Sequence, residues 1–221
     1  MDISVAALTL LHVLVLVLVY WLGGDLGAFY GSTFMIDPKR SVTERRMALQ
    51  ILNNVDLAPR TALILALPTG LALASAKSWI NVPAFVPAFV GVACLGWLAL
   101  VWAVHLIHGG GLLFKRLDIA IRWVVLIVLF CSGIAALAKM IELPLFIALK
   151  LIILGTCISL GLVVRKQIAP LFRAFRQMVA NGATPVTDAI ITRANGNARV
   201  SVLSLWALLL VAPWLGTATP I

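Results

Sequence analysis

Two ionisable side chains lie inside long apolar stretches of the sequence. His12 interrupts the stretch from Ile3 to Leu22, and Lys150 interrupts the stretch from Leu145 to Val164. Such groups are costly inside a membrane and usually face a partner, a cavity or a cofactor. A neutral imidazole is a common haem ligand, and a neutral amine can be a second ligand or lie beside the bound group. We therefore expect His12 and Lys150 to bind a metal-containing cofactor.

Each of these residues also has a structural interpretation. A buried histidine can be hydrogen-bonded to a neighbouring helix, and a lysine can extend its amine toward the membrane surface. A helix rises about 1.5 Å per residue, which places His12 about 14 Å and Lys150 about 9 Å below the same membrane boundary. The two side chains can therefore meet at one level of the membrane.

A second set of polar side chains is expected near the opposite boundary. His105 and His108 are three residues apart, so they can share a helix face and point at a second haem or a quinone head group. An ordinary interfacial histidine pair beside Trp102 is the alternative. Arg60 and Arg122 are expected at a similar depth, and either can hold a haem propionate or another anion.

The composition excludes a soluble domain. The 221 residues are 62% hydrophobic and only 11% charged, and the mean hydropathy is +1.10. The net charge of +9 follows the positive-inside rule and does not indicate a nucleic-acid partner, because basic residues gather in alternate connections. The opposite side receives only Lys77 and Lys139. The rule therefore predicts that both termini lie on the non-cytoplasmic, periplasmic side.

Six apolar stretches are long enough to cross about 30 Å of hydrocarbon. They lie near 3–30, 44–76, 84–108, 117–139, 144–168 and 197–215. These stretches predict an all-α polytopic bundle, a single domain over residues 1–221, in the inner membrane of a bacterium. The N-terminus has no basic region or cleavage site typical of a removable signal peptide. A helix extension with a turn at Asn181-Gly182 is expected before the last stretch.

Glycine and cysteine spacing and the absence of catalytic motifs limit the kinds of packing and chemistry that we expect. Gly23, Gly27 and Gly31 form a small-residue ridge, which favours close helix packing within the chain or in a homo-oligomer. The three cysteines occur singly, and no HExxH motif or nucleophile–base–acid triad is present, so hydrolytic chemistry is not expected. A bound haem would be noncovalent because the sequence has no CxxCH motif.

Short motifs of the chain resemble two membrane protein families. Leu11-His12-Val13 followed by Tyr20-Trp21-Leu22-Gly23-Gly24 is similar to the first helix of the HemJ-like and CopD-like families. Glu44-Arg45-Arg46 resembles the entry to the second HemJ helix, and Pro144 to Pro170 resembles the lysine-bearing helix of both families. The resemblance to HemJ implies haem binding at His12 and Lys150 and oxidation of protoporphyrinogen; the resemblance to CopD implies copper resistance or uptake.

The chain also departs from the HemJ pattern. A tyrosine–histidine pair that often follows the lysine helix is absent between Ser159 and Val163. The resemblance therefore favours haem binding over porphyrinogen oxidation. Against copper transport, the five methionines do not cluster with His or Cys as Cu(I) sites favour.

The sequence as a whole predicts a lipid-embedded protein that binds haem b, with more than one haem if the second histidine set is also used. It would exchange electrons with a quinone, a redox partner protein or a porphyrin, either as a membrane oxidoreductase or as a cytochrome subunit. Two alternatives stay open: a CopD-like copper permease, and a structural anchor subunit of a respiratory complex.

Overall fold

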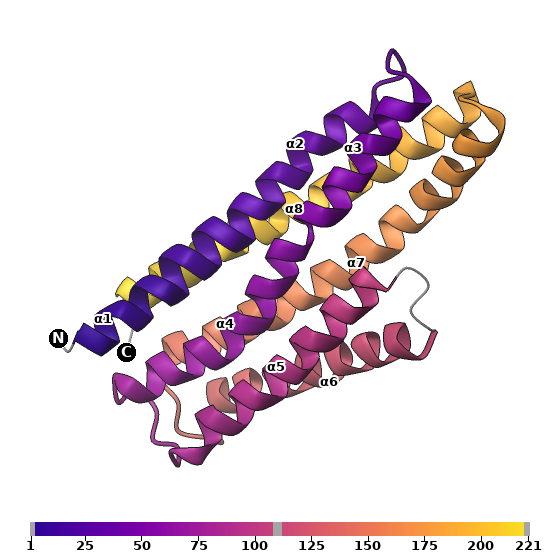
Figure 1. Cartoon of the computed structure of the whole chain (residues 1–221). Coiled ribbons are helices and arrows are strands. Elements are labelled where there is room, and N and C mark those ends of the chain that lie inside the picture. Colours follow the sequence, from indigo (N-terminus) through magenta and orange to yellow (C-terminus); the bar gives the residue numbers. More distant parts are fainter. Residues whose placement is uncertain (1–2, 108–111, 219–221) are drawn as a thin grey trace.

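The computed structural model describes residues 3–107 and 112–218, and every regular element in them is a helix (Figure 1). Six helical units are long and apolar enough to cross a membrane. This confirms the predicted all-α polytopic bundle and the multi-pass membrane architecture.

The first two crossings are built from shorter helices. The first consists of α1 (Ile3–Thr9), the π-helix η1 (Leu10–Gly23) and α2 (Gly24–Ile36). The second consists of α3 (Val42–Val55) and α4 (Leu57–Ala76). Ser41 and Glu44 form a reciprocal capping box, in which each side chain accepts a hydrogen bond from the backbone N–H of the other. The box fixes the start of α3 directly after the turn at residues 37–41.

The other four crossings are single helices. They are α5 (Phe85–Leu106), α6 (Leu112–Leu137), α7 (Leu145–Asn181) and α8 (Pro185–Ala218). Gly182 follows α7 with a φ of 86°, a left-handed conformation that favours glycine. The predicted helix extension and the turn at Asn181-Gly182 are therefore confirmed.

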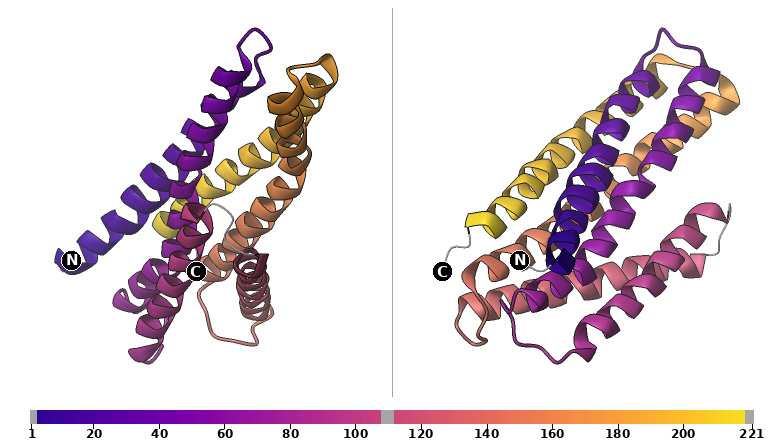
Figure 2. Two further views of the ribbon diagram at one scale, coloured as in Figure 1. Left: turned by 45° about the vertical axis from the view of Figure 1, so that its right-hand side comes forward. Right: turned by 60° about the vertical axis from the view of Figure 1, so that its left-hand side comes forward.

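Three helical crossings are longer than the hydropathy pattern predicted. The first extends to Ile36, the fifth extends to Asn181, and the sixth begins at Pro185 instead of near residue 197. As a result, two hairpins, α2–α3 and α7–α8, project beyond α5 and α6 and lie side by side (Figures 1 and 2). We call this the hairpin end of the bundle. The start of α1 and the end of α8, with the turns at 77–84 and 138–144, lie at the other end, the terminal end (Figure 1).

The bundle and its hairpin end are stabilised by separate apolar cores. The main core joins η1, α4, α6, α7 and α8 and includes Trp21, Ala62, Leu129 and Ile158. At the hairpin end, a second core joins α2, α7 and α8 around Met35, Phe175, Met178 and Ile191. The hairpins are therefore packed against one another and are not free extensions.

The predicted glycine ridge is used only in part. A Cβ at Gly27 would lie 3.4 Å from Val55, and one at Gly23 would lie 3.7 Å from the carbonyl oxygen of Leu18. The closest approach is at Gly24, outside the predicted ridge, where a Cβ would lie 2.7 Å from Pro59 Cδ. A Cβ at Gly31 would meet no atom within 4 Å. Close packing between α2 and the α3–α4 junction therefore depends on Gly24 and Gly27.

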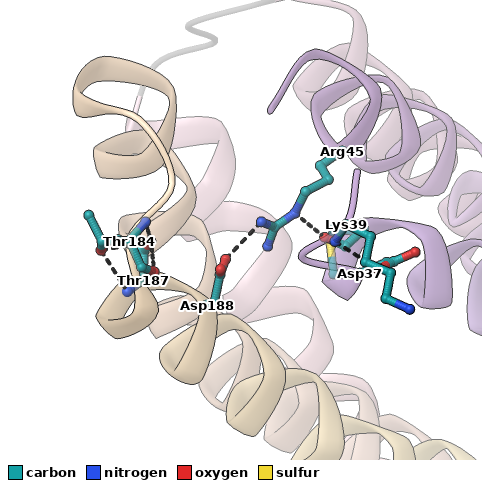
Figure 3. Close-up of polar contacts among 7 residues, drawn as sticks. Asp37, Lys39, Arg45, Thr184, Thr187 and Asp188 are labelled. Atoms are coloured by element: carbon teal, nitrogen blue, oxygen red, sulfur yellow. Dashed lines mark hydrogen bonds and ion pairs between the residues drawn. The ribbon is translucent and has the colours of Figure 1, made fainter. Parts of the chain in front are cut away.

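A buried arginine joins the two hairpins (Figure 3). Arg45 on α3 has no exposed surface. Its Nε donates to the carbonyl of Met35 at 2.8 Å, and its Nη1 donates to Asp188 Oδ1 on α8 at 2.7 Å. The sequence offers Arg45 only as one of the basic residues that follow the first apolar stretch, and the structure shows it as a clamp between helices.

Candidate functional site

His12 lies on η1 and faces α4. Its Nδ1 is 2.8 Å from the hydroxyl oxygen of Thr69. The imidazole lies close to Gly70, where a Cβ would be 3.2 Å from His12 Cε1 and 3.7 Å from Nε2. The absence of a side chain at Gly70 thus lets the ring approach the backbone of α4.

The hydrogen bonds of Thr69 define which nitrogen of His12 carries the proton. The Thr69 hydroxyl donates its one hydrogen to the carbonyl of Leu65 at 2.6 Å. Its oxygen must then accept from His12, so Nδ1 is the protonated nitrogen. Nε2 is left with a free lone pair, which is the arrangement that a metal-ligating histidine requires.

Lys150 lies on α7 near the terminal end. Its ammonium contacts Gly216 on the last turns of α8 so closely that a methyl group there would overlap it. The ammonium also lies 5.8 Å from the ring centroid of Phe146. The structure thus brings the two residues to one end of the bundle, although each is packed against a different helix.

A cavity of about 560 Å³ opens between the helices toward the hairpin end, and neither His12 nor Lys150 lines it. Its wall is mostly apolar, with contributions from Trp21, Leu63 and Ile158. Charged side chains from α2, the α3–α4 junction, α4, α6, α7 and α8 interrupt this wall: Asp25, Asp56, Arg60, Lys115, Asp118, Arg122, Arg165 and Arg199.

Asp118 is the carboxylate that links two of these basic side chains. It is only 3% exposed. It accepts hydrogen bonds from Arg122 Nε at 3.1 Å, from Arg165 Nη2 at 2.9 Å and from the indole N–H of Trp97 at 3.0 Å. Two guanidinium groups thus share one carboxylate, which leaves an excess of positive charge beside the cavity.

The other predicted residues of this end have local partners. Arg60 forms an ion pair with Asp56, one turn earlier. His105 Nε2 lies 3.2 Å from the amide oxygen of Asn54 and does not line the cavity. His108 lies outside the described residues. Arg60 and Arg122 are therefore brought together at the cavity, while His105 lies apart from it.

Sequence reasoning missed several of these residues. The four-residue spacing of Asp118 and Arg122 was a visible signal for an ion pair. Thr69 carried no such signal, because its role depends on the packing of η1 against α4. Among residues 3–107 and 112–218, no group of three or more His, Cys, Asp or Glu side chains is arranged to hold a metal ion.

Comparison with known proteins assigns no family to the chain. No family model, curated protein or solved structure matches it.

Proposed function

We propose that this protein is a multi-pass membrane haem protein in which His12 Nε2 is an iron ligand. The observation that supports this proposal is the hydrogen-bond chain from His12 through Thr69 to the carbonyl of Leu65. It fixes the tautomer, orients the ring and leaves Nε2 as the only free nitrogen of the imidazole.

The residues at the terminal end have distinct roles in this proposal. Thr69 holds the imidazole by accepting from Nδ1–H, and Gly70 gives the ring room against α4. Lys150 is the second ligand or a positive charge beside the bound group. A noncovalent haem b supplies one-electron redox chemistry when bound. The protein tunes its reduction potential through hydrogen bonds to the ligand, here the bond from His12 to Thr69.

The proposal extends to family and location. We infer that the chain is a member of the HemJ-like and CopD-like group in the inner membrane of a bacterium, with the hairpin end in the cytoplasm. Quinones, porphyrins and redox proteins are the partner classes that a membrane-embedded haem serves. The donor set of one imidazole and one amine supports haem over copper transport, since Cu(I) prefers thiolate and thioether ligands.

The Thr69 hydrogen bond provides a specific test of this site. The haem content of purified Thr69→Val is compared with that of wild type and of Thr69→Ser, by pyridine haemochrome assay after titration with haem. Loss of the hydroxyl should weaken haem binding about 10- to 100-fold, and Thr69→Ser should restore it. His105→Ala is the matched control and should bind haem as wild type does.

Equal haem binding by Thr69→Val and wild type would contradict the proposed role of His12 Nδ1. A colourless wild-type protein from haem-sufficient cells would instead favour copper transport or an anchoring role in a respiratory complex.

A further inference from the structure

The cavity near the hairpin end has the features of a second binding site. It is separate from His12 and Lys150, and this inference does not depend on the haem proposal. The cavity combines a mainly apolar wall with the guanidinium groups of Arg60, Arg122, Arg165 and Arg199. A ligand that fits such a wall has an apolar body and an anionic group.

Buried donors in the cavity wall lack partners. Arg122 is only 6% exposed. Its Nη2 makes no hydrogen bond to any residue in 3–107 or 112–218, although its Nε is bound to Asp118. The Nε of Arg199 is likewise buried without a partner among these residues. An unpaired buried donor on a charged group is costly, so both groups favour an additional acceptor.

Arg199 is held at the cavity wall without a carboxylate partner among the described residues. Its guanidinium lies 4.0 Å from the ring centroid of Phe29, and its Nη2 donates to the Phe29 carbonyl at 3.3 Å. No salt bridge joins Arg199 to a carboxylate among the described residues. With Arg122 and Arg165 sharing Asp118, the cavity wall offers more positive charge than its own carboxylates neutralise there.

Two of the cavity's guanidinium groups, those of Arg60 and Arg122, lie at a depth suited to a lipid head group. Arg122 is 15 residues from the end of α6 at Leu137, or about 23 Å along the helix. Arg60 is 16 residues from the end of α4 at Ala76, or about 24 Å. With the reach of the side chains, both guanidinium groups lie near the far boundary of a hydrocarbon layer about 30 Å thick.

A basic groove borders this cavity. The groove, of about 530 Å³, lies between α3 and α7 and carries the basic residues Arg46 and Arg176. It shares Leu49, Asn53 and Phe172 with the wall of the cavity. The basic residues of the groove therefore attract anions to a surface that borders the cavity.

We propose that this cavity binds an anionic amphiphile, whose phosphate or carboxylate group accepts hydrogen bonds from Arg122 and Arg199. Its apolar body packs on the wall formed by Trp21, Leu63 and Ile158. The amphiphile is either an anionic membrane phospholipid or a free amphiphilic carboxylate, because the same guanidinium groups recognise both.

Native mass spectrometry of the full-length protein in detergent tests this proposal. Phosphatidylglycerol, phosphatidylcholine and oleate are titrated separately into the delipidated protein. We expect Arg122→Gln and Arg199→Gln each to weaken phosphatidylglycerol binding about 10-fold, the effect of losing one charge-assisted hydrogen bond. Arg116→Gln on α6 and Arg193→Gln on α8 are exposed, matched controls and should bind as wild type does.

A second pair of variants tests the cavity without changing its charge. Gly161 lines the cavity, and a Cβ there would meet no atom within 4 Å. Gly161→Leu should therefore place its side chain in the cavity and reduce binding at least 10-fold. Gly96→Leu is the control, because Gly96 is also open but lies outside the cavity.

The outcomes separate the two sources of the ligand. Tight phosphatidylglycerol binding without oleate binding identifies a phospholipid site, and oleate binding with the same dependence on Arg122 and Arg199 identifies a carboxylate site. The proposal is wrong if phosphatidylcholine binds as tightly as phosphatidylglycerol, or if the arginine and glycine variants bind as wild type does. Arg199→Gln keeps the test valid if Arg122→Gln does not fold, since Arg199 forms no ion pair with a described carboxylate.

Discussion

Replacement of Arg45 by methionine should separate the two hairpins. Arg45 is completely buried and donates charge-assisted hydrogen bonds to the Met35 carbonyl and to Asp188. Methionine fills much of the same volume but donates neither bond. The carbonyl of Met35 then loses its side-chain donor, and Asp188 loses the cation that faces it (Figure 3).

The expected loss follows from the burial of the two partners. Breaking a buried ion pair by removing one partner costs about 3–5 kcal/mol. The side chain of Asp188 is 23% exposed, so water recovers part of the lost interaction. We therefore expect a loss of about 3 kcal/mol in the free energy of opening at the hairpin end.

Hydrogen exchange measured by mass spectrometry reports this local opening. A loss of about 3 kcal/mol corresponds to roughly 100-fold faster amide exchange in peptides from residues 35–49 and 171–194. Peptides from α5 should exchange at the wild-type rate. Arg46→Met is the matched control, because Arg46 is the exposed neighbour of Arg45 and should change exchange by less than about 3-fold.

A double-mutant cycle identifies the partner. Asp188→Asn in the Arg45→Met background should cost less than it does in wild type, since the carboxylate no longer faces a guanidinium group. Strictly additive effects, or equal effects of Arg45→Met and Arg46→Met, would refute the assignment of Arg45 as the clamp.

Two further predictions concern packing and orientation. Gly133→Ala should lower the thermal midpoint in detergent by an amount equivalent to about 1–3 kcal/mol, because its Cβ would lie 2.7 Å from Ile152 Cγ1 and 3.1 Å from the Ala148 carbonyl oxygen. Gly96→Ala, at an open position, should leave the midpoint unchanged. An unchanged midpoint for Gly133→Ala would contradict the α6–α7 packing. An Ala183→Cys variant, free of native cysteines, should react with an impermeant maleimide in inverted vesicles but not in intact cells; labelling in intact cells would reverse the proposed orientation.

The sequence was sufficient for the six membrane-crossing helical units and for the turn at Asn181-Gly182. Hydropathy detects a crossing because the whole helix is apolar, and glycine marks the point where a left-handed conformation is needed. The lengths of the hairpins were not predictable in this way. Residues 168–197 are polar on their outer faces, and an average over a window hides the inner face that carries Phe175, Met178 and Ile191.

Some site residues were likewise recognisable from the sequence, and others depend on how the helices pack. His12 and Lys150 stood out because ionisable groups are rare in apolar stretches. Arg45 appeared as one of many basic residues near a boundary, because its partner Asp188 is 143 residues away. Only the fold shows that Thr69 faces His12 and that Arg199 faces the cavity, since both depend on how separate helices pack.

A reduced-minus-oxidised absorption spectrum of the purified protein tests the central proposal most directly. Wild-type protein from haem-sufficient cells should show a b-type spectrum, which His12→Ala abolishes and Lys150→Ala shifts or weakens. A colourless wild-type protein, or a spectrum that His12→Ala leaves unchanged, would contradict haem ligation by His12.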